Sequence, residues 1–124
     1  MKTNRTTRLA AFCLLAASQL ACAGKAVAVR EDGETPITLR GTVIGPISSG
    51  SKADGTFFKA YHLKLGRAMT FDDGADCSEQ SKASLALNQE DMGRYKGKII
   101  TVKAKVFCQT NRTGTYHLSG IVVQ

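Results

Sequence analysis

Three aspartates and a cysteine lie close together in the stretch TFDDGADCSEQ, residues 70–80. The carboxylates belong to Asp72, Asp73 and Asp76, and Cys77 follows the last of them directly. Clustered carboxylates can bind a divalent cation or act as a general acid and base, and a cysteine can serve as a nucleophile or metal ligand. The same residue types also form surface turns.

The spacing of these aspartates does not match a calcium-binding loop. An EF-hand needs D-x-D-x-D-G with a distal glutamate and at least about six oxygen ligands, and the stretch lacks that pattern. Acid–base catalysis by paired carboxylates needs desolvation to separate their pKa values, and a hydrophilic turn offers little of it. We therefore expect a surface turn and no cofactor. Asp72, Asp73 and Asp76 remain candidates for a metal-dependent or hydrolytic enzyme, which is the alternative.

No nucleophile motif strengthens the catalytic alternative. The sequence lacks G-x-S-x-G, and neither His62 nor His117 has an evident serine or cysteine partner. Both histidines fall at polar positions of alternating segments, so we expect them to lie in solvent on outward strand faces.

Residues 1–23 have the features of a secretory signal. MKTNRTTR carries three basic residues and no acid, an uncharged apolar run follows, and Ala21-Cys22-Ala23 fits a cleavage site, with Ala26-Val27-Ala28 as a second candidate. The run is too short to span a bilayer comfortably. We expect a periplasmic or secreted protein without a transmembrane segment in its mature chain; lipid attachment at Cys22 is the alternative.

Cleavage after residue 23 changes the charge and the cysteine count. It removes three of seventeen basic residues and none of the ten acids, so the formal net charge falls from +7 to +4. Cys77 and Cys108 are the remaining cysteines. Because exported thiols are normally oxidised, a Cys77–Cys108 disulfide is predicted.

About one hundred mature residues suffice for one domain with a modest core. Residues 24–36 form a polar lead-in, and strand-like alternation begins after Pro36. Apolar and polar residues alternate in four segments, which are ITLRGTVIG, FFKAYHLKLG, KIITVKAKVFC and TYHLSGIVV. A shorter apolar segment, ASLAL, lies between the second and third of these and is predicted to be a further strand, the third in chain order. In the last long segment, Tyr116, Leu118 and Val122 are expected to point inward.

One short helix is predicted in NQEDMGRYKG, between the third and fourth strands. Asn88 is a suitable N-cap, acidic residues follow it, and Gly97 suits the stop. The resulting order predicts an all-β fold, a five-stranded OB-fold-like barrel over residues 37–124. In such a barrel Cys77 and Cys108 lie at the same end. An immunoglobulin-like sandwich would need about seven strands and no such helix.

Several short motifs resemble a bacterial exported family known as domain of unknown function 4431. They are LRGTV, YHLKL leading to Asp76-Cys77, YKGKIITVKAKV and TGTYHLSGIVV, and they span nearly all of residues 37–124. The resemblance implies an OB-like barrel in an exported, uncharacterised protein. It implies no activity.

A positive stripe is predicted on the outer surface of the barrel. If the first strand lies between the second and fourth, outward Arg40 is flanked by Lys64 on one side and by Lys103 and Lys105 on the other. We call these four residues the basic stripe. Scattered lysines that discourage aggregation are the simpler explanation, and a docking surface for an acidic protein or an envelope polyanion is the functional one.

Nucleic acid is a poor candidate for the partner. OB barrels that bind single strands place stacking aromatics beside a basic groove, whereas Tyr61 and Tyr116 are predicted to face the core. We therefore expect a non-catalytic binding or accessory module of the bacterial envelope.

Overall fold

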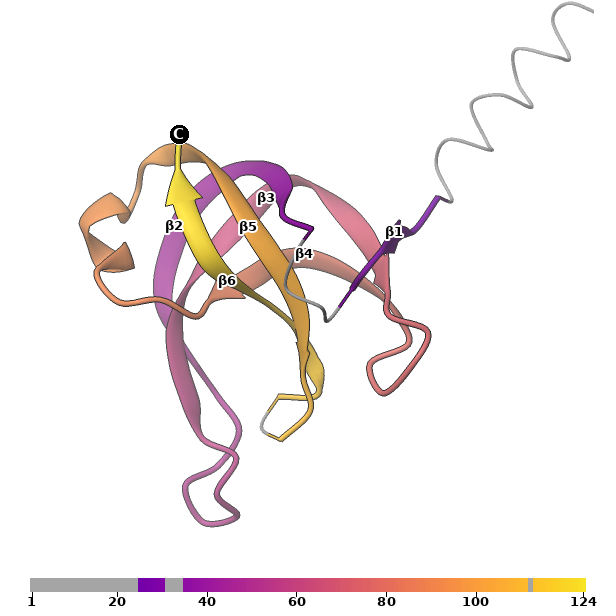
Figure 1. Ribbon diagram of the computed structural model, residues 1–124. Helices are drawn as coiled ribbons and strands as arrows, with labels where there is room; N and C mark the ends of the chain where they lie inside the picture. The colour runs from indigo at the N-terminus through magenta and orange to yellow at the C-terminus, as the bar shows by residue number, and fades with distance from the viewer. Residues whose placement is uncertain (1–24, 31–34, 112) are drawn as a thin grey trace, which may run out of the picture.

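The computed structural model describes residues 25–30, 35–111 and 113–124. Its secondary structure consists almost entirely of strands, which form one curved sheet (Figure 1). The strands are β1 (Val27–Ala28), β2 (Ile37–Ser49), β3 (Phe58–Asp72), β4 (Glu79–Leu87), β5 (Ile99–Gln109) and β6 (Thr115–Val123).

The five long strands close into a barrel. β2 pairs antiparallel with β3 on one side and with β5 on the other. β3 continues antiparallel to β4, β5 is antiparallel to β6, and the parallel pair of β4 with β6 completes the ring. The predicted all-β five-stranded barrel is confirmed, and β2 lies between β3 and β5 as expected.

The barrel interior holds the apolar residues of the alternating segments. Alternate side chains of a strand point to opposite faces of a sheet, so one set of positions fills the core. Its largest fully buried side chains come from all five long strands: Val43, Leu63, Phe71, Leu85, Val102, Tyr116 and Leu118. The ring centroids of Phe71 and Tyr116 lie 5.8 Å apart inside the barrel.

The expected helix between the third and fourth long strands is not formed. That connection contains only a 3₁₀ turn, η1 (Met92–Tyr95). The amide of Gln89 bonds both backbone groups of Ile121, and Asn88 bonds His117. These contacts hold the segment against β6, and Asp91 has a left-handed conformation with φ 66°, so no regular helix starts at Asn88.

A bulge near the end of β6 overturns one inward assignment. Lys105 pairs with Ser119 and Lys103 with Val122, so Gly120 and Ile121 stand opposite one residue of β5. Gly120 has φ 56°, a left-handed conformation that glycine adopts readily and that accompanies such bulges. The extra residue moves Ile121 into the core and leaves Val122, expected to point inward, 59% exposed.

Part of the expected polar lead-in is structured. β1 pairs in parallel with the end of β3, Val27 opposite Phe71 and Ala28 opposite Asp72. The next residue, Val29, is buried, and its amide donates to the Asp72 carbonyl. The predicted signal, residues 1–23, lies outside the described residues. Among those residues, no helix has the length and apolar character needed to cross a bilayer.

Candidate functional site

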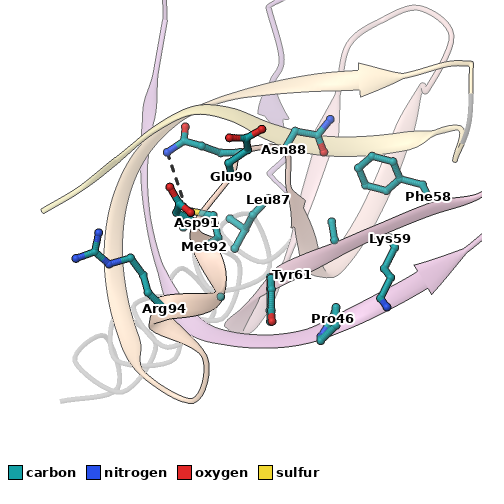
Figure 2. A pocket seen from close by; sticks show the side chains of 13 residues that line it. Pro46, Phe58, Lys59, Tyr61, Leu87, Asn88, Glu90, Asp91, Met92 and Arg94 are labelled. Atoms are coloured by element: carbon teal, nitrogen blue, oxygen red, sulfur yellow. Dashed lines mark hydrogen bonds between the residues drawn. The ribbon is translucent and has the colours of Figure 1, made fainter.

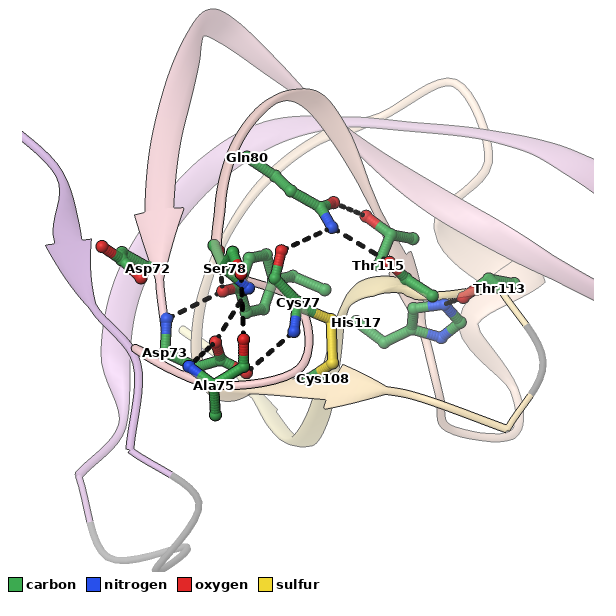
Figure 3. The surroundings of a disulfide bond; sticks show 12 residues. Asp72, Asp73, Ala75, Cys77, Ser78, Gln80, Cys108, Thr113, Thr115 and His117 are labelled. Carbon is green, nitrogen blue, oxygen red and sulfur yellow. Dashed lines mark hydrogen bonds between the residues drawn. A yellow bond between two sulfur atoms is a disulfide. The ribbon is translucent and has the colours of Figure 1, made fainter.

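The aspartate turn, residues 72–76, is organised around Asp73 (Figure 3). Its Oδ1 accepts hydrogen bonds from the amides of Ala75 at 2.8 Å and Ser78 at 3.0 Å, and its Oδ2 accepts one from Cys77 at 3.3 Å. Desolvation acts to raise the pKa of Asp73, but these amides outweigh it and hold the pKa below its ordinary value. The carboxylate therefore serves as an acceptor for the turn's own backbone.

Tyr116 fastens this turn to β6. Its buried hydroxyl accepts a hydrogen bond from the amide of Asp73 at 2.8 Å and donates to the carbonyl of Ser78. Burial raises the pKa of Tyr116 to about 12, so the hydroxyl keeps its proton at neutral pH. The predicted inward position of Tyr116 is correct.

The predicted disulfide joins Cys77 to Cys108, with their Cα atoms 5.8 Å apart. Ligand-type atoms of Asp73 and both cysteines lie within 4.8 Å of one another. The sulfurs are bonded to each other, however, and metal binding requires thiolates. Asp72 accepts from the amide of Gly74 at 2.8 Å, and Asp76 is exposed. This geometry supports the turn interpretation of the three aspartates.

The strand register brings three members of the basic stripe to one region. Lys103 stands opposite Thr38, and Lys64 stands opposite Thr42. Residues directly opposite in antiparallel strands share a face, so both lysines lie on the exposed face of β2 that carries Arg40. Lys105 lies further along β5, half-buried beside Ser119 of β6.

The same surface contains a shallow hollow that the sequence analysis missed. Arg40 and Lys64 line it together with Arg67 and Ile99. Arg67 belongs to β3, which continues past the expected end of its segment to Asp72. Ile99 is 63% exposed, so an apolar side chain lies among these cations. Among the described residues, none of the basic side chains here has an acidic partner within ion-pair distance.

His117 is not solvated, which corrects the prediction from strand alternation. It lies on the outer side of β6 but is only 1% exposed, because Phe58 and Phe107 pack against it with ring centroids 4.9 and 5.8 Å away. Its Nδ1 lies 2.8 Å from Asn88 Oδ1, and its Nε2 lies 2.6 Å from Thr113 Oγ1. The tautomer that satisfies both partners has the hydrogen on Nδ1 and accepts from the threonine hydroxyl. Desolvation lowers the pKa of His117 to about 4.

His62 is half-buried rather than fully solvated, and lies close to the second histidine. Its Nδ1 is 3.1 Å from Ser84 Oγ. Desolvation, followed by the charge of Lys82, lowers the pKa of His62. Lys82 and Ser84 come from β4, whose outer residues carried no recognisable motif.

The two histidines line a pocket of about 360 Å³, which we call the histidine pocket. It lies between the base of the β2–β3 hairpin and the β5–β6 turn, and its other lining residues include Phe58, Lys82, Ser84 and Thr113. No alternation pattern predicts it, because it depends on the β5–β6 turn and Phe58 of β3 lying over the outer face of the sheet.

A second cavity lies between the β2–β3 hairpin and the connection that contains η1 (Figure 2). Lys59 and Arg94 line it, and so do Glu90 and Asp91, so its charges are mixed. The ring of Tyr61 lies against Gly93, where an added Cβ would come within 2.8 Å of it. Close packing of the connection on β3 therefore explains the glycine.

Comparison of the chain with protein-family models, curated proteins and solved structures finds no match.

Proposed function

We propose that this protein is an exported, non-catalytic binding module whose basic stripe docks an acidic protein or an envelope polyanion. Arg40, Lys64 and Lys103 form the centre of the docking surface, with Arg67 and Lys105 at its margins. The positive charge of β2, β3 and β5 attracts the partner over distances of about a Debye length, and Ile99 adds apolar contact.

The observation that carries this proposal is that the positive charges on that surface are not paired with acidic side chains of the described residues. Cations from three strands lie on one side of the barrel, and no acidic side chain within the described ranges forms an ion pair with them. Lysines that discourage aggregation are typical of an unpaired edge strand. β2 is paired on both sides, so this simpler explanation does not account for Arg40 and its neighbours.

Export and the OB-like fold are parts of the same proposal. Export is supported by positions 1–23, which have a basic start, an apolar run and small residues at the end. The disulfide is compatible with an oxidising compartment. The ring order β2-β3-β4-β6-β5 supports an OB-like barrel. A single-stranded nucleic acid is disfavoured as the partner, because Tyr116 is buried and the stripe has no aromatic residue among its members.

Charge reversal tests the stripe directly. Arg40→Glu/Lys103→Glu is compared with the parent on immobilised polyglutamate and heparin over a salt gradient. The stripe variant should elute at clearly lower salt, because its contacts are electrostatic. The matched control is Lys52→Glu/Lys59→Glu, which changes the net charge equally at exposed positions of the β2–β3 hairpin.

The control should elute close to the parent. Equal losses in both variants would show that net charge alone governs retention, and unchanged retention of the stripe variant would refute the docking surface. Both variants should keep the parent's melting temperature nearly unchanged, since exposed charges contribute about 0–1 kcal/mol each.

A further inference from the structure

We propose that the histidine pocket is a binding site for a small oxyanion group, a phosphate or a carboxylate, held by the ammonium group of Lys82 with His62 and Ser84. Ser84 stands opposite Lys64, so this site adjoins the basic stripe. The pocket would take a ligand of small size rather than an extended partner.

The pocket is built across the closure of the barrel. His62 of β3 stands opposite Ala86 of β4, and Ala86 stands opposite His117 of β6. The two histidines therefore flank the small side chain of Ala86 on one outer surface. Phe58, at the start of β3, and Thr113, in the β5–β6 turn, also line the pocket. The result is a recess whose lining is fixed by strand register.

The hydrogen-bond inventory of the lining leaves donors available. The amide nitrogen of Gln80 is occupied by the carbonyls of Cys77 and Gly114. The Thr113 hydroxyl is used by His117. Lys82, by contrast, has no hydrogen-bond or ion-pair partner within the described part of the chain. An ammonium group has three donor hydrogens and no acceptor, so that of Lys82 can donate to a ligand that offers acceptors.

His62 adds a second donor to that of Lys82. When the Ser84 hydroxyl donates to His62 Nδ1, the ring hydrogen is on Nε2, which can donate to a ligand. A group that offers several acceptor oxygens and no donors matches this set.

The charge of the pocket selects an anion over a neutral or cationic ligand. Lys82 is the only formally charged side chain among the described residues of the lining, and no carboxylate lines the pocket. Besides the desolvation of each ring, the charge of Lys82 also lowers the pKa of both histidines, so its field reaches across the pocket. An oxyanion would neutralise that field, and would raise the pKa of His62.

The test uses NMR titration of the folded protein at constant ionic strength with three separate probes: inorganic phosphate, glycerol phosphate and acetate. We expect saturable shifts of the His62 ring with at least one probe, and the probe that binds most tightly identifies a free phosphate, a phosphate ester or a carboxylate as the ligand group. No saturable response to any of the three would overturn the proposal.

Substitutions then locate the site. Lys82→Met keeps the aliphatic stem and removes the charge, and should weaken binding at least about tenfold, the equivalent of one charge-assisted hydrogen bond. Ser84→Ala should weaken it severalfold without any change in charge. Lys103→Met removes the same charge from the basic stripe and should leave the affinity within about twofold of the parent.

Equal weakening by Lys82→Met and Lys103→Met would mean general charge attraction and would refute the pocket. The two proposals fail separately. If the stripe variant keeps the parent's retention on heparin while the small anions bind in the NMR titration, only the docking surface is refuted. If the stripe variant loses retention while no small anion binds, only the histidine pocket is refuted. If Lys82→Met alters the melting temperature, the Ser84→Ala comparison still decides the result.

Discussion

His117 combines deep burial with a complete set of hydrogen bonds. Asn88 and Thr113 satisfy its two nitrogens, and aromatic rings cover its faces. Burial keeps this imidazole neutral, because desolvation penalises its charged form and the charges of His62 and Lys82 add to that effect. The residue therefore links the stability of the barrel to pH.

The stability of the protein should fall as the pH is lowered from about 6.5 toward 4. The pKa of His117 is about 4 in the folded protein and near 6.5 when unfolded, so in this range the unfolded chain binds a proton that the folded chain does not. The stabilisation is complete above about pH 6.5, and on the order of 2–3 kcal/mol is lost by pH 4. Urea unfolding midpoints measured between about pH 4.5 and 7.5 would show it.

His117→Gln provides the comparison for this pH effect. Glutamine does not titrate, so the midpoint should vary less with pH in the variant than in the parent. His62→Gln is the control, and should retain most of the parent's dependence because His117 carries the larger shift. A parent whose stability is independent of pH across this range would contradict the neutral, buried state of His117.

At the level of elements, the bulge of β6 is hydrogen-bonded to the connection before η1. Gly120 and Ile121 are displaced from regular pairing with β5. The amide group of Gln89 replaces the missing strand contacts, accepting from the Ile121 amide at 2.8 Å and donating to its carbonyl at 3.0 Å. One side chain therefore fixes the connection to the last strand.

Gln89→Ala should lower the free energy of unfolding by about 1–2 kcal/mol, because two hydrogen bonds are lost and the backbone groups of Ile121 are left without them. Glu90→Ala is the matched control at the next, exposed position, and should change stability by less than about 0.5 kcal/mol. Chemical denaturation of the three proteins measures the difference. Equal stability of the parent and Gln89→Ala would show that the two hydrogen bonds between Gln89 and Ile121 do not stabilise the fold.

The strands could be predicted from the sequence because alternation is a local property. Leu39 and Val43, or Val102 and Val106, repeat at the spacing that one strand face imposes, and the structure buries them. The disulfide followed from the two cysteines that remain after the predicted signal. The prediction of a helix starting at Asn88 was wrong, because tertiary hydrogen bonds to β6 outweigh the local preference of Asn88 for a helix N-cap.

The candidate sites were harder to predict for a related reason. Alternation correctly assigned His117 to the outer side of its strand, yet burial there comes from Phe58, fifty-nine residues earlier in the chain. Lys82 and Ser84 belong to no motif, and only pairing of β4 with β3 and β6 brings them to the histidines. Arg40, Lys64 and Lys103 could be assigned to one face because this needs strand order alone.

At the level of the whole molecule, the disulfide ties the entrance of β4 to the end of β5. It closes a loop with a sequence separation of 31 residues. Cys77→Ala/Cys108→Ala should reduce the stability by about 3–4 kcal/mol on the chain-entropy model, a large part of the total for a domain of this size. Thermal unfolding of the parent, oxidised and reduced, and of the double variant measures the loss.

The reduced parent and the double variant should unfold at similar, lower temperatures than the oxidised parent. The hydrogen bonds of Asp73 and Tyr116 do not involve the sulfur atoms, so we expect the turn to keep part of its order in both. An unchanged melting temperature after complete reduction would show that those hydrogen bonds and the core suffice without the covalent link.

The place of β6 in the ring has a consequence for the order of folding. It follows β2 to β5 in the chain, and among the described strands it alone joins β4 to β5. When a chain is made or translocated from its N-terminus, β2 to β5 are complete while both of these edges are still unpaired. The cysteines both precede β6, so they can be oxidised at that stage, whereas closure must wait for Thr115–Val123. Until then the open edges can pair with another chain, and this interval is when the protein is most exposed to aggregation.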